Sequence, residues 1–317
     1  MAVKLVASAC SDKGCVRKNN EDSFCLNGHF LKREKMDEGG LFKYSATPYA
    51  LFAVCDGMGG EEAGEEASLL AVSRCAESLK ARENLFDREK LVYFLRAGCE
   101  AVYAQAKERG NHSGATMALL IAAADRLRIA NMGDSRIYRL SAGEMKQLTV
   151  DHTEIQRLYT QGKITREQMK THPKRHMIYQ YWGMPLDRAP FQPYISTSIP
   201  YVNRDRYLIC SDGLTDMLTN EEIKSVLSAQ APVEQISEAL VRNAKARGGR
   251  DNVTVVVIEV ESDDEKTVDP NAKAKPKKKE VSIQTLYARR KKFRRLLALV
   301  GVVNLYLIAE WIEFFLR

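Results

Sequence analysis

The chain has 317 residues, 45% of them hydrophobic, so it can bury a substantial core in one large or two modest domains. Its net charge is +7; residues 271–295 carry +10 and residues 296–317 carry −1, which leaves −2 on the first 270 residues. The globular part therefore lacks the basicity of a nucleic-acid-binding domain. Seven cysteines without a CxxC pair favour a reducing compartment over a disulfide framework. The apolar stretch between Lys4 and Cys10 is shorter than the roughly 7 to 15 residues of an export signal, which favours a cytosolic domain.

Short β-rich runs alternate with two helical zones along the first 260 residues. The predicted strands are residues 4–10, 22–26, 49–55, 116–123, 126–131, 136–140, 194–199, 206–210 and 252–259. The first helical zone holds amphipathic segments at 62–79 and 87–109. The second follows a predicted N-cap at Asn220 and continues from Pro232 to a pair of glycines. Strands grouped apart from helices predict an α+β fold with largely antiparallel sheets.

The periodic pattern weakens between residues 153 and 193, where short helical pieces precede a proline-rich stretch. We expect a flap subdomain at about 153–193 within a domain of residues 1–260. Residues 261–295 are polar and basic and are expected to form a disordered linker.

Residues 296–317 form a hydrophobic segment that carries Asn304, Glu310 and Glu313. The 21 residues of 296–316 are long enough to span about 30 Å as a helix if both glutamates lie at the far interface. The preceding Lys/Arg cluster predicts the cytoplasmic side and contact with anionic lipid, so we expect a single-pass segment. A helix in the membrane surface and a helix packed on a partner or on the chain itself are the alternatives.

Acidic residues interrupt the chain at five predicted strand ends. Asp56 ends the run "YALFAVCDG", and Asp212 repeats the pattern in "YLICSDG". Asp134 follows another short apolar run, and the pair Glu21 and Asp22 precedes one. Asp251 precedes the last predicted strand. One Asp-Gly at a strand end is ordinary turn chemistry, but five such positions favour a shared site.

Converging carboxylates are typical of sites for Mg²⁺ or Mn²⁺, which prefer oxygen ligands. Strand ends can bring carboxylates together across about 200 residues of sequence because the sheet sets their spacing. Gly57, with no Cβ, would let its backbone carbonyl approach an ion. Metal ions in such a site activate water, so no side-chain nucleophile is needed. The sequence has no GxSxG, P-loop or HExxH motif.

Seven blocks in order resemble the signature blocks of the metal-dependent type 2C serine/threonine protein phosphatases. They are "GCVRKNNED" (14–22), "VCDGMGG" (54–60), "SGATM" (113–117), "NMGDSRIY" (131–138), "LTVDHT" (148–153), "CSDGLTD" (210–216) and "GGRDNVTVVV" (248–257). The resemblance covers about residues 4–260. It implies a sandwich of two antiparallel sheets flanked by helix pairs, which agrees with the α+β prediction, and it makes residues 1–260 a phosphatase catalytic domain.

The resemblance also implies roles for individual residues. Asp56 would bridge two metal ions, with the Gly57 carbonyl on one of them. Asp212 and Asp251 would complete the first site, and Asp22 with Glu21, through water, the second. Asp134 would share a third, weaker ion with Asp212, as in bacterial members. Arg17 would grip the substrate phosphate, because its guanidinium forks onto two oxygens.

Two features depart from the family pattern. Met58 stands where some members have a histidine that acts as general acid, and methionine cannot donate a proton. His152 is a candidate substitute, or it hydrogen-bonds the base of the flap. In the flap, "RHMIYQYWG" (175–183) replaces the more usual RNVITRALG-like run and introduces Tyr179, Tyr181 and Trp182, either for substrate preference or for packing.

The resemblance implies a hydrolase of phosphoserine and phosphothreonine in proteins that uses two or three Mn²⁺ or Mg²⁺ ions. We expect it on the cytoplasmic face of the cell membrane, opposing a serine/threonine kinase; a membrane-bound kinase is one candidate partner. The alternatives are a catalytically inactive scaffold that binds phosphoproteins, disfavoured by the complete set of aspartates, and a nucleic-acid-binding protein, disfavoured by the charge of the first 270 residues.

Overall fold

The computed structural model describes residues 3–46, 49–59, 63–123 and 125–262. They fall into two compact units, one with residues up to 153 and from 178 onward, the other with residues 154–177. The second unit contains the short helices α3 (Glu154–Thr160) and α4 (Arg166–Thr171). A capping box between Thr165 and Gln168 begins α4.

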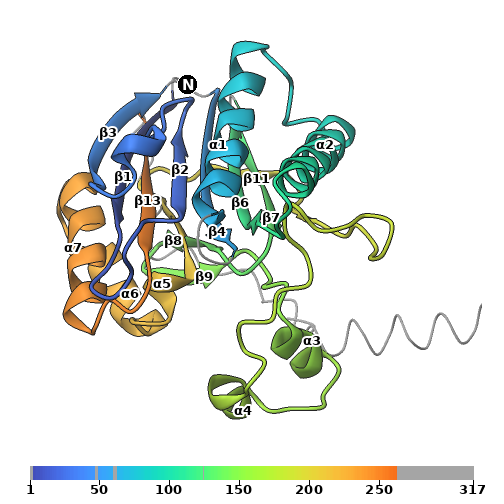
Figure 1. Cartoon of the computed structure of the whole chain (residues 1–317). Helices are drawn as coiled ribbons and strands as arrows, with labels where there is room; N and C mark the ends of the chain where they lie inside the picture. Colours follow the sequence, from blue (N-terminus) through green and yellow to red (C-terminus); the bar gives the residue numbers. More distant parts are fainter. Residues whose placement is uncertain (1–2, 47–48, 60–62, 124, 263–317) are drawn as a thin grey trace, which may run out of the picture. The chain divides into compact units, whose positions relative to one another are not determined.

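Two β-sheets form the centre of the first unit (Figure 1), and every strand pairing between described residues is antiparallel. Sheet A is ordered β3 (Gly40–Ala46), β1 (Val3–Asp12), β13 (Val253–Ser262), β12 (Arg206–Cys210), β8 (Arg136–Ser141) and β9 (Glu144–Gln147). Sheet B is ordered β10 (Tyr194–Ile195), β7 (Arg126–Met132), β6 (Met117–Ala123), β4 (Ala50–Met58) and β2 (Asp22–Leu26), with β11 (Ile199–Pro200) on β7 and β5 (Gly114–Ala115) on β4.

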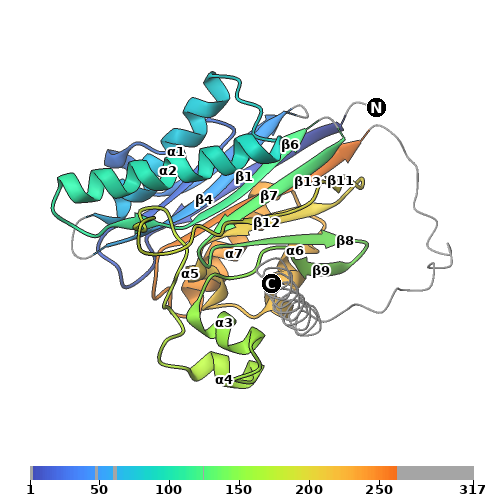
Figure 2. The ribbon, with the colours of Figure 1, turned by 90° about the vertical axis from the view of Figure 1, so that its right-hand side faces the viewer.

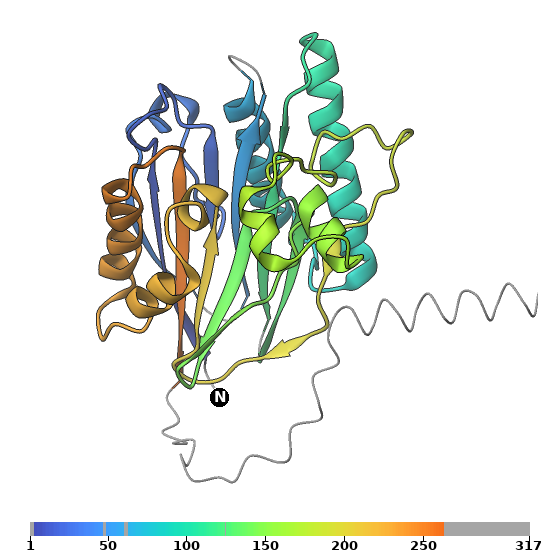
Figure 3. The same ribbon diagram turned by 90° about the horizontal axis from the view of Figure 1, so that it is seen from below.

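Helices cover the outer face of each sheet. Helices α1 (Gly64–Lys80) and α2 (Arg88–Glu108) pack over sheet B (Figure 2). Sheet A is covered by α5 (Asp212–Thr215), α6 (Asn220–Leu227) and α7 (Val233–Ala246). Figure 3, seen from below, shows α7 in orange and α2 in teal on opposite sides of the two sheets. A 3-10 turn, η1 (Arg33–Lys35), lies between β2 and β3.

Three hydrophobic clusters follow from this layering. Strand β12 is buried on both faces: Tyr207 and Ile209 lie in the cluster between the sheets, whereas Leu208 and Cys210 lie in the cluster beneath α6 and α7. This alternation is the period-2 geometry of a strand. A central strand that is apolar on both faces therefore reads as a continuous apolar run, which explains why "RYLIC" is so clear in the sequence.

Side chains cap the N-termini of α2 and α6. The predicted segment 87–109 forms α2, and Asp87 is its N-cap: its side chain accepts hydrogen bonds from the backbone N–H groups of Glu89 and Lys90. The predicted N-cap at Asn220 is wrong by one residue: Thr219 caps α6 in a capping box with Glu222. Thr219 is favoured over Asn220 as the N-cap because the side chains of Thr219 and Glu222 together accept hydrogen bonds from two backbone N–H groups.

The expected α+β fold with two antiparallel sheets is confirmed, with differences at its edges. The predicted strand 194–199 is two separate short strands, β10 and β11, and β3, β5 and β9 were not predicted. The predicted C-terminal helix and nearly all of the predicted linker lie outside the described residues. Within the described ranges, no helix is long and apolar enough to cross a membrane.

Candidate active site

Two predicted site residues are paired on neighbouring strands of sheet B. Asp22, the first residue of β2, is directly opposite Asp56, near the end of β4. Asp22 is buried and Asp56 is half-buried. The backbone of Asp56 is held on its other side by Thr116: the Asp56 N–H donates to Thr116 Oγ1, and the Thr116 N–H donates to the Asp56 carbonyl, both at 2.8 Å. Thr116 was not singled out from the sequence, although it lies in the "SGATM" block.

Three further aspartates lie where strands of sheet A end. Cys210 of β12 is paired with Arg136 of β8 on one side and with Val255 of β13 on the other. Asp212 follows Cys210 by two residues, and Asp134 precedes Arg136 by two. Asp251 lies just before β13 begins. The register of sheet A therefore sets these three aspartates at the same edge.

Hydrogen bonds join the acidic ends of the two sheets. The Ser211 hydroxyl donates to Asp22 Oδ2 at 2.7 Å and accepts from the Thr254 N–H at 3.1 Å. The Glu21 N–H donates to Asn252 Oδ1 at 2.8 Å. These contacts link the start of β2 to the residue that follows β12 and to the residue that precedes β13. The sequence prediction missed Ser211 and Asn252; each is the neighbour of a predicted ligand, in "CSDG" and "RDN".

Glu21 is fixed by its backbone more than by its side chain. Its carbonyl accepts hydrogen bonds from the Gly57 N–H at 3.1 Å and from the Ser68 hydroxyl at 2.6 Å. Burial and the charge of Glu65 raise the pKa of the Glu21 carboxyl. Glu65, at the start of α1, is itself held by Arg33 at 2.6 Å. The predicted ligand Glu21 thus lies beside Asp22 and Asp56, with a second glutamate behind it.

The electrostatics of this edge are unfavourable for the charged carboxylates by themselves. Burial raises the pKa of Asp22 to about 7, opposed by hydrogen bonds from Ser211 and Thr254 and reinforced by the charges of Asp212 and Asp251. Burial, followed by the charges of neighbouring aspartates, raises the pKa of both Asp56 and Asp134 well above the usual range. Each carboxyl group therefore resists ionisation in the presence of the others, a pattern that concentrates at functional sites.

The residues at this edge fit a hard divalent cation. Their donor set consists of carboxylate oxygens, which are the ligands that Mg²⁺ and Mn²⁺ prefer. Among the described residues, buried Asp22 Oδ1 has no hydrogen-bond partner. An unpaired buried acceptor needs an explanation, and an ion is a sufficient one. A cation would also offset the repulsion that raises the aspartate pKa values.

The two glycines of the repeated Asp-Gly pattern have a reason that the sequence analysis did not find. A Cβ on Gly57 would lie 2.1 Å from the Gly64 carbonyl oxygen and 2.6 Å from that of Glu21. A Cβ on Gly213 would lie 1.9 Å from the Asn252 carbonyl oxygen. Both glycines let the backbone next to a predicted ligand pack tightly against another segment. This close packing, independent of any ion, is sufficient to require glycine.

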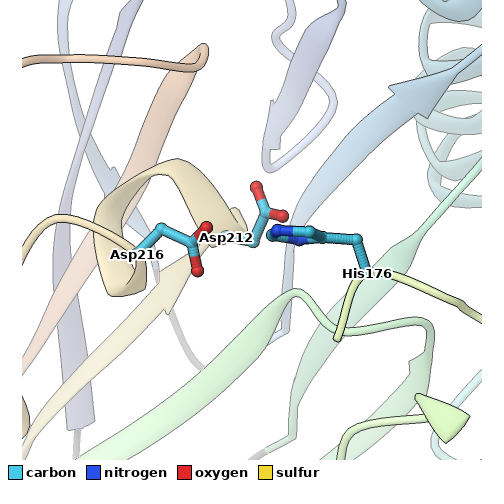
Figure 4. A group of neighbouring side chains, drawn as sticks. All are labelled: His176, Asp212 and Asp216. Atoms are coloured by element: carbon cyan, nitrogen blue, oxygen red, sulfur yellow. The ribbon is translucent and has the colours of Figure 1, made fainter. Parts of the chain in front are cut away.

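A second aspartate, Asp216, is the C-cap of α5, the short helix that begins at Asp212. The side chains of Asp212 and Asp216 come from the same helical turn (Figure 4), and an oxygen of one lies within 4.8 Å of an oxygen of the other. Asp216 belongs to the "CSDGLTD" block but was not predicted as a site residue. His176, also labelled in Figure 4, belongs to the other unit, and we assign it no role in this site.

Arg17 lies at the margin of the acidic edge. Its Nη2 donates to Asp251 Oδ2 at 2.8 Å, and its side chain is half exposed. Burial lowers the pKa of the Arg17 guanidinium, but the hydrogen bond and charge of Asp251 outweigh it, so the group is firmly cationic. The loop before Arg17 is tied down by the Cys15 N–H, which donates to the Gly249 carbonyl at 2.7 Å. The structure thus brings Arg17 together with the predicted ligand Asp251.

His152 does not have the properties of a general acid. Its Nδ1 accepts a hydrogen bond from the Gly133 N–H at 3.2 Å, and burial lowers its pKa to about 4. The ring is therefore neutral near pH 7 and positions the turn before Asp134. Its carbonyl accepts from the Tyr179 N–H at 2.9 Å, which supports the alternative that His152 hydrogen-bonds the segment following residues 154–177.

Comparisons with known proteins agree with this geometry. The chain is 29% identical over 255 residues to the serine/threonine phosphatase stp of Listeria welshimeri, covering 78% of this chain and 93% of that protein. It is 35% identical over 256 residues to the serine/threonine protein phosphatase PstP of Mycobacterium tuberculosis, covering 80% of this chain and 44% of that protein. The crystal structure of the PstP catalytic domain in complex with two manganese ions matches with a TM-score of 0.66 and 34% identity, over 82% of this chain and all of that one.

A family model covers most of the same region. The model described as "Protein phosphatase 2C" matches residues 37–253. This range contains the predicted ligands from Asp56 to Asp251; Glu21 and Asp22 precede it, and the match to PstP covers 80% of the chain. The chain belongs to the protein phosphatase 2C family.

Proposed function

We propose that the protein hydrolyses phosphoserine and phosphothreonine esters in proteins, with Mn²⁺ or Mg²⁺ as its cofactor. The observation that carries the proposal is the meeting of Asp22 and Asp56 from sheet B with Asp134, Asp212 and Asp251 from sheet A at one edge. Family membership and the manganese-bound PstP structure support it. A partly buried group of mutually repelling carboxylates has little value for stability and is best explained by cation binding.

Each residue at the edge has a proposed role. Asp56 would bridge two ions, with the Gly57 carbonyl on one of them. Asp212 and Asp251 would complete the first site. The remaining ligands would be Asp22 and Glu21 for the second ion, the latter through water, and Asp134 with Asp212 for a third. The bound ions supply an activated water nucleophile and compensate the charge of the phosphoryl group.

The other residues would position the substrate and the ligands. Arg17 would hold two phosphoryl oxygens, because its half-exposed guanidinium is oriented by Asp251 and a planar fork suits a phosphate. Ser211 and Thr116 would fix the two central aspartates through the hydrogen bonds described above. Met58 has no proton to donate and His152 is neutral, so neither serves as the general acid.

Hydrolysis of a phosphopeptide and of a chromogenic phosphate ester by the purified protein tests the proposal. We expect turnover in Mn²⁺ that is lost on adding excess chelator and recovered on adding Mn²⁺ again. Binding of the phosphopeptide without turnover in Mn²⁺ or Mg²⁺ would contradict the proposal and favour a phosphoprotein-binding scaffold.

The domain organisation, location and partners that we propose rest on the sequence. Residues 1–260 would be the catalytic domain, the region around 153–193 its flap, and residues 261–295 a linker. The basic cluster and residues 296–317 would attach the enzyme to the cytoplasmic face of an anionic membrane. There it would oppose a serine/threonine kinase, since tethering raises the effective concentration of membrane-bound substrates.

A further inference from the structure

Trp182 is connected to the candidate metal site through one very short strand. Ala115 of β5 pairs with Gly57 of β4, and Gly114 pairs with Met58. On the other side of β5, the Ala115 N–H donates to the Trp182 carbonyl at 2.9 Å, and the Trp182 N–H donates to the Ala115 carbonyl at 2.8 Å. The two-residue strand β5 is therefore clamped between Trp182 and the end of β4 that carries Asp56.

The indole of Trp182 is seated in a notch in helix α2. Trp182 is fully buried, and a Cβ on Gly98 would lie only 2.1 Å from its Cη2 atom. Gly98 lies inside α2, where glycine is unfavourable relative to alanine and its φ needs no glycine. The absence of a side chain at residue 98 is thus explained by the indole. Phe94, one turn earlier, packs against the same ring with centroids 5.6 Å apart.

The backbone on both sides of Trp182 is closely packed against the segment that contains β5. Gly183 has φ +100°, and a Cβ there would lie 2.8 Å from the Ser113 carbonyl oxygen. A Cβ on Gly114 would lie 2.6 Å from Tyr181 Cδ2. The backbone is therefore closely packed on both sides of the pairing between Ala115 and Trp182.

The indole is not present for a hydrogen bond of its own. Trp182 Nε1 is buried and has no partner in the part of the chain that the structure describes. Burying an N–H without a partner is destabilising, and a purely apolar side chain would avoid that penalty. The size and shape of the ring are therefore what the site uses.

We propose that Trp182, seated against Gly98, is a positioning residue that sets the place of Asp56 and Gly57 through β5. The inference rests on the proposed function, because it concerns the same metal site. A rigid indole between α2 and β5 holds Ala115 at a fixed distance from the helix, and Ala115 in turn holds Gly57. A smaller side chain would let β5 relax toward α2 and displace the predicted ligands.

Substitutions in the full-length protein test this coupling. Trp182→Leu should weaken Mn²⁺ binding in calorimetry about tenfold and lower kcat by about tenfold or more, because ångström-scale misplacement is costly in catalysis. The KM for a phosphopeptide should change by less than about threefold, since Arg17 is untouched. Trp182→Phe, which keeps a ring in the notch, should bind Mn²⁺ within about threefold of wild type.

Filling the notch tests the same contact from the other side. Gly98→Ala should also weaken Mn²⁺ binding, because its methyl group displaces the indole. The double variant Gly98→Ala/Trp182→Leu should bind Mn²⁺ better than either single variant, since the extra methyl fills space that leucine leaves. If Gly98→Ala alone does not fold, comparing the double variant with Trp182→Leu still tests this contact.

The control is a core substitution far from β5. Leu240→Ala removes a fully buried side chain of α7 and should lower the melting temperature while leaving Mn²⁺ binding and kcat at the wild-type level below the melting range. If Trp182→Leu is no more affected than Leu240→Ala in Mn²⁺ binding and kcat, the indole only packs and the proposal is overturned. If the wild type binds Mn²⁺ but does not hydrolyse phosphopeptide, the proposed function fails, and calorimetry still decides the role of Trp182. A wild type that binds no Mn²⁺ would overturn both.

Discussion

The Ser211 hydroxyl and the Asp22 carboxylate are separated by 189 residues in the chain and by 2.7 Å in the fold. This hydrogen bond joins the segment after β12 of sheet A to the first residue of β2 in sheet B. It also leaves Asp22 Oδ1, the other carboxylate oxygen, without a hydrogen-bond partner among the described residues. One oxygen of Asp22 is thus oriented by the protein while the other remains for a ligand, which is typical of a metal-binding carboxylate.

Ser211→Ala should weaken Mn²⁺ binding without unfolding the protein. Removing the hydroxyl frees the Asp22 carboxylate to rotate, and the loss of a hydrogen bond behind a ligand typically costs about 10- to 100-fold in metal affinity or activity. Calorimetry with Mn²⁺ measures the effect, and Ser228→Ala, at the C-cap of α6, is a matched control. Equal Mn²⁺ affinities for Ser211→Ala and wild type would show that Asp22 needs no such support.

Asp56→Asn should abolish most of the activity while the fold is kept. Replacing a bridging carboxylate by a neutral amide weakens both proposed metal sites, and we expect at least about a hundredfold loss, equivalent to about 3 kcal/mol of barrier. Phosphopeptide turnover in saturating Mn²⁺ gives the rate, and far-UV circular dichroism checks the fold. More than about a tenth of wild-type turnover would contradict the bridging role.

Arg17→Ala should raise the KM for a phosphopeptide more than it lowers kcat. A group that holds the phosphate in both the bound substrate and the transition state contributes mainly to uniform binding. Arg17→Lys should recover only part of the loss, because lysine keeps the charge but not the planar fork. An unchanged KM in Arg17→Ala would exclude Arg17 as the phosphate ligand.

The metal-free protein should lose stability as the pH rises from about 4 to about 7. Burial raises the pKa of Asp22 to about 7, above about 3.9 for an aspartate in an unfolded chain. Between these values the folded state binds more protons than the unfolded state, so the free energy of unfolding falls with increasing pH. Thermal melts in chelator at pH 5 and pH 7.5 measure the change, and excess Mn²⁺ should reverse it at the higher pH.

Asp22→Asn is the control for this pH dependence. His152 acts in the opposite direction, because burial lowers its pKa to about 4 and the unfolded state then binds more protons up to about pH 6.5. His152 is unchanged in Asp22→Asn, so the difference between the two proteins isolates the aspartate. A wild type and an Asp22→Asn variant with the same pH dependence in chelator would refute the assignment.

The proposed membrane attachment of residues 296–317 predicts the behaviour of the protein in cell fractions. A spanning segment should keep the full-length protein in the membrane pellet through washes with high salt and with carbonate. A variant that ends after residue 262 should leave the pellet and hydrolyse a small phosphate ester at the wild-type rate. Release of the full-length protein by salt alone would favour a surface helix held by charge, and its absence from the pellet without any wash would favour a partner helix.

The sequence was sufficient to predict the class of fold and the carboxylates of the candidate site. Runs such as "RYLIC" and "VTVVV" identify central strands because both faces are buried, and the acidic residues that follow or precede such runs identify strand ends. The amphipathic pattern from Asp87 onward likewise identified the start of α2 to within one residue, because helix periodicity is a local pattern. Features that depend on a few neighbouring residues were therefore accessible without coordinates.

Only the tertiary structure decided which of these residues meet and what supports them. The strand β3 is weakly apolar and exists because it pairs along β1, and the region 194–199 is divided because β10 and β11 each pair briefly with β7. The close approach of Gly213 to Asn252 and of Gly98 to the Trp182 ring joins segments far apart in the chain. Such contacts are set by sheet register and by packing between layers, and a local sequence pattern does not encode the distance between backbones that are remote in sequence.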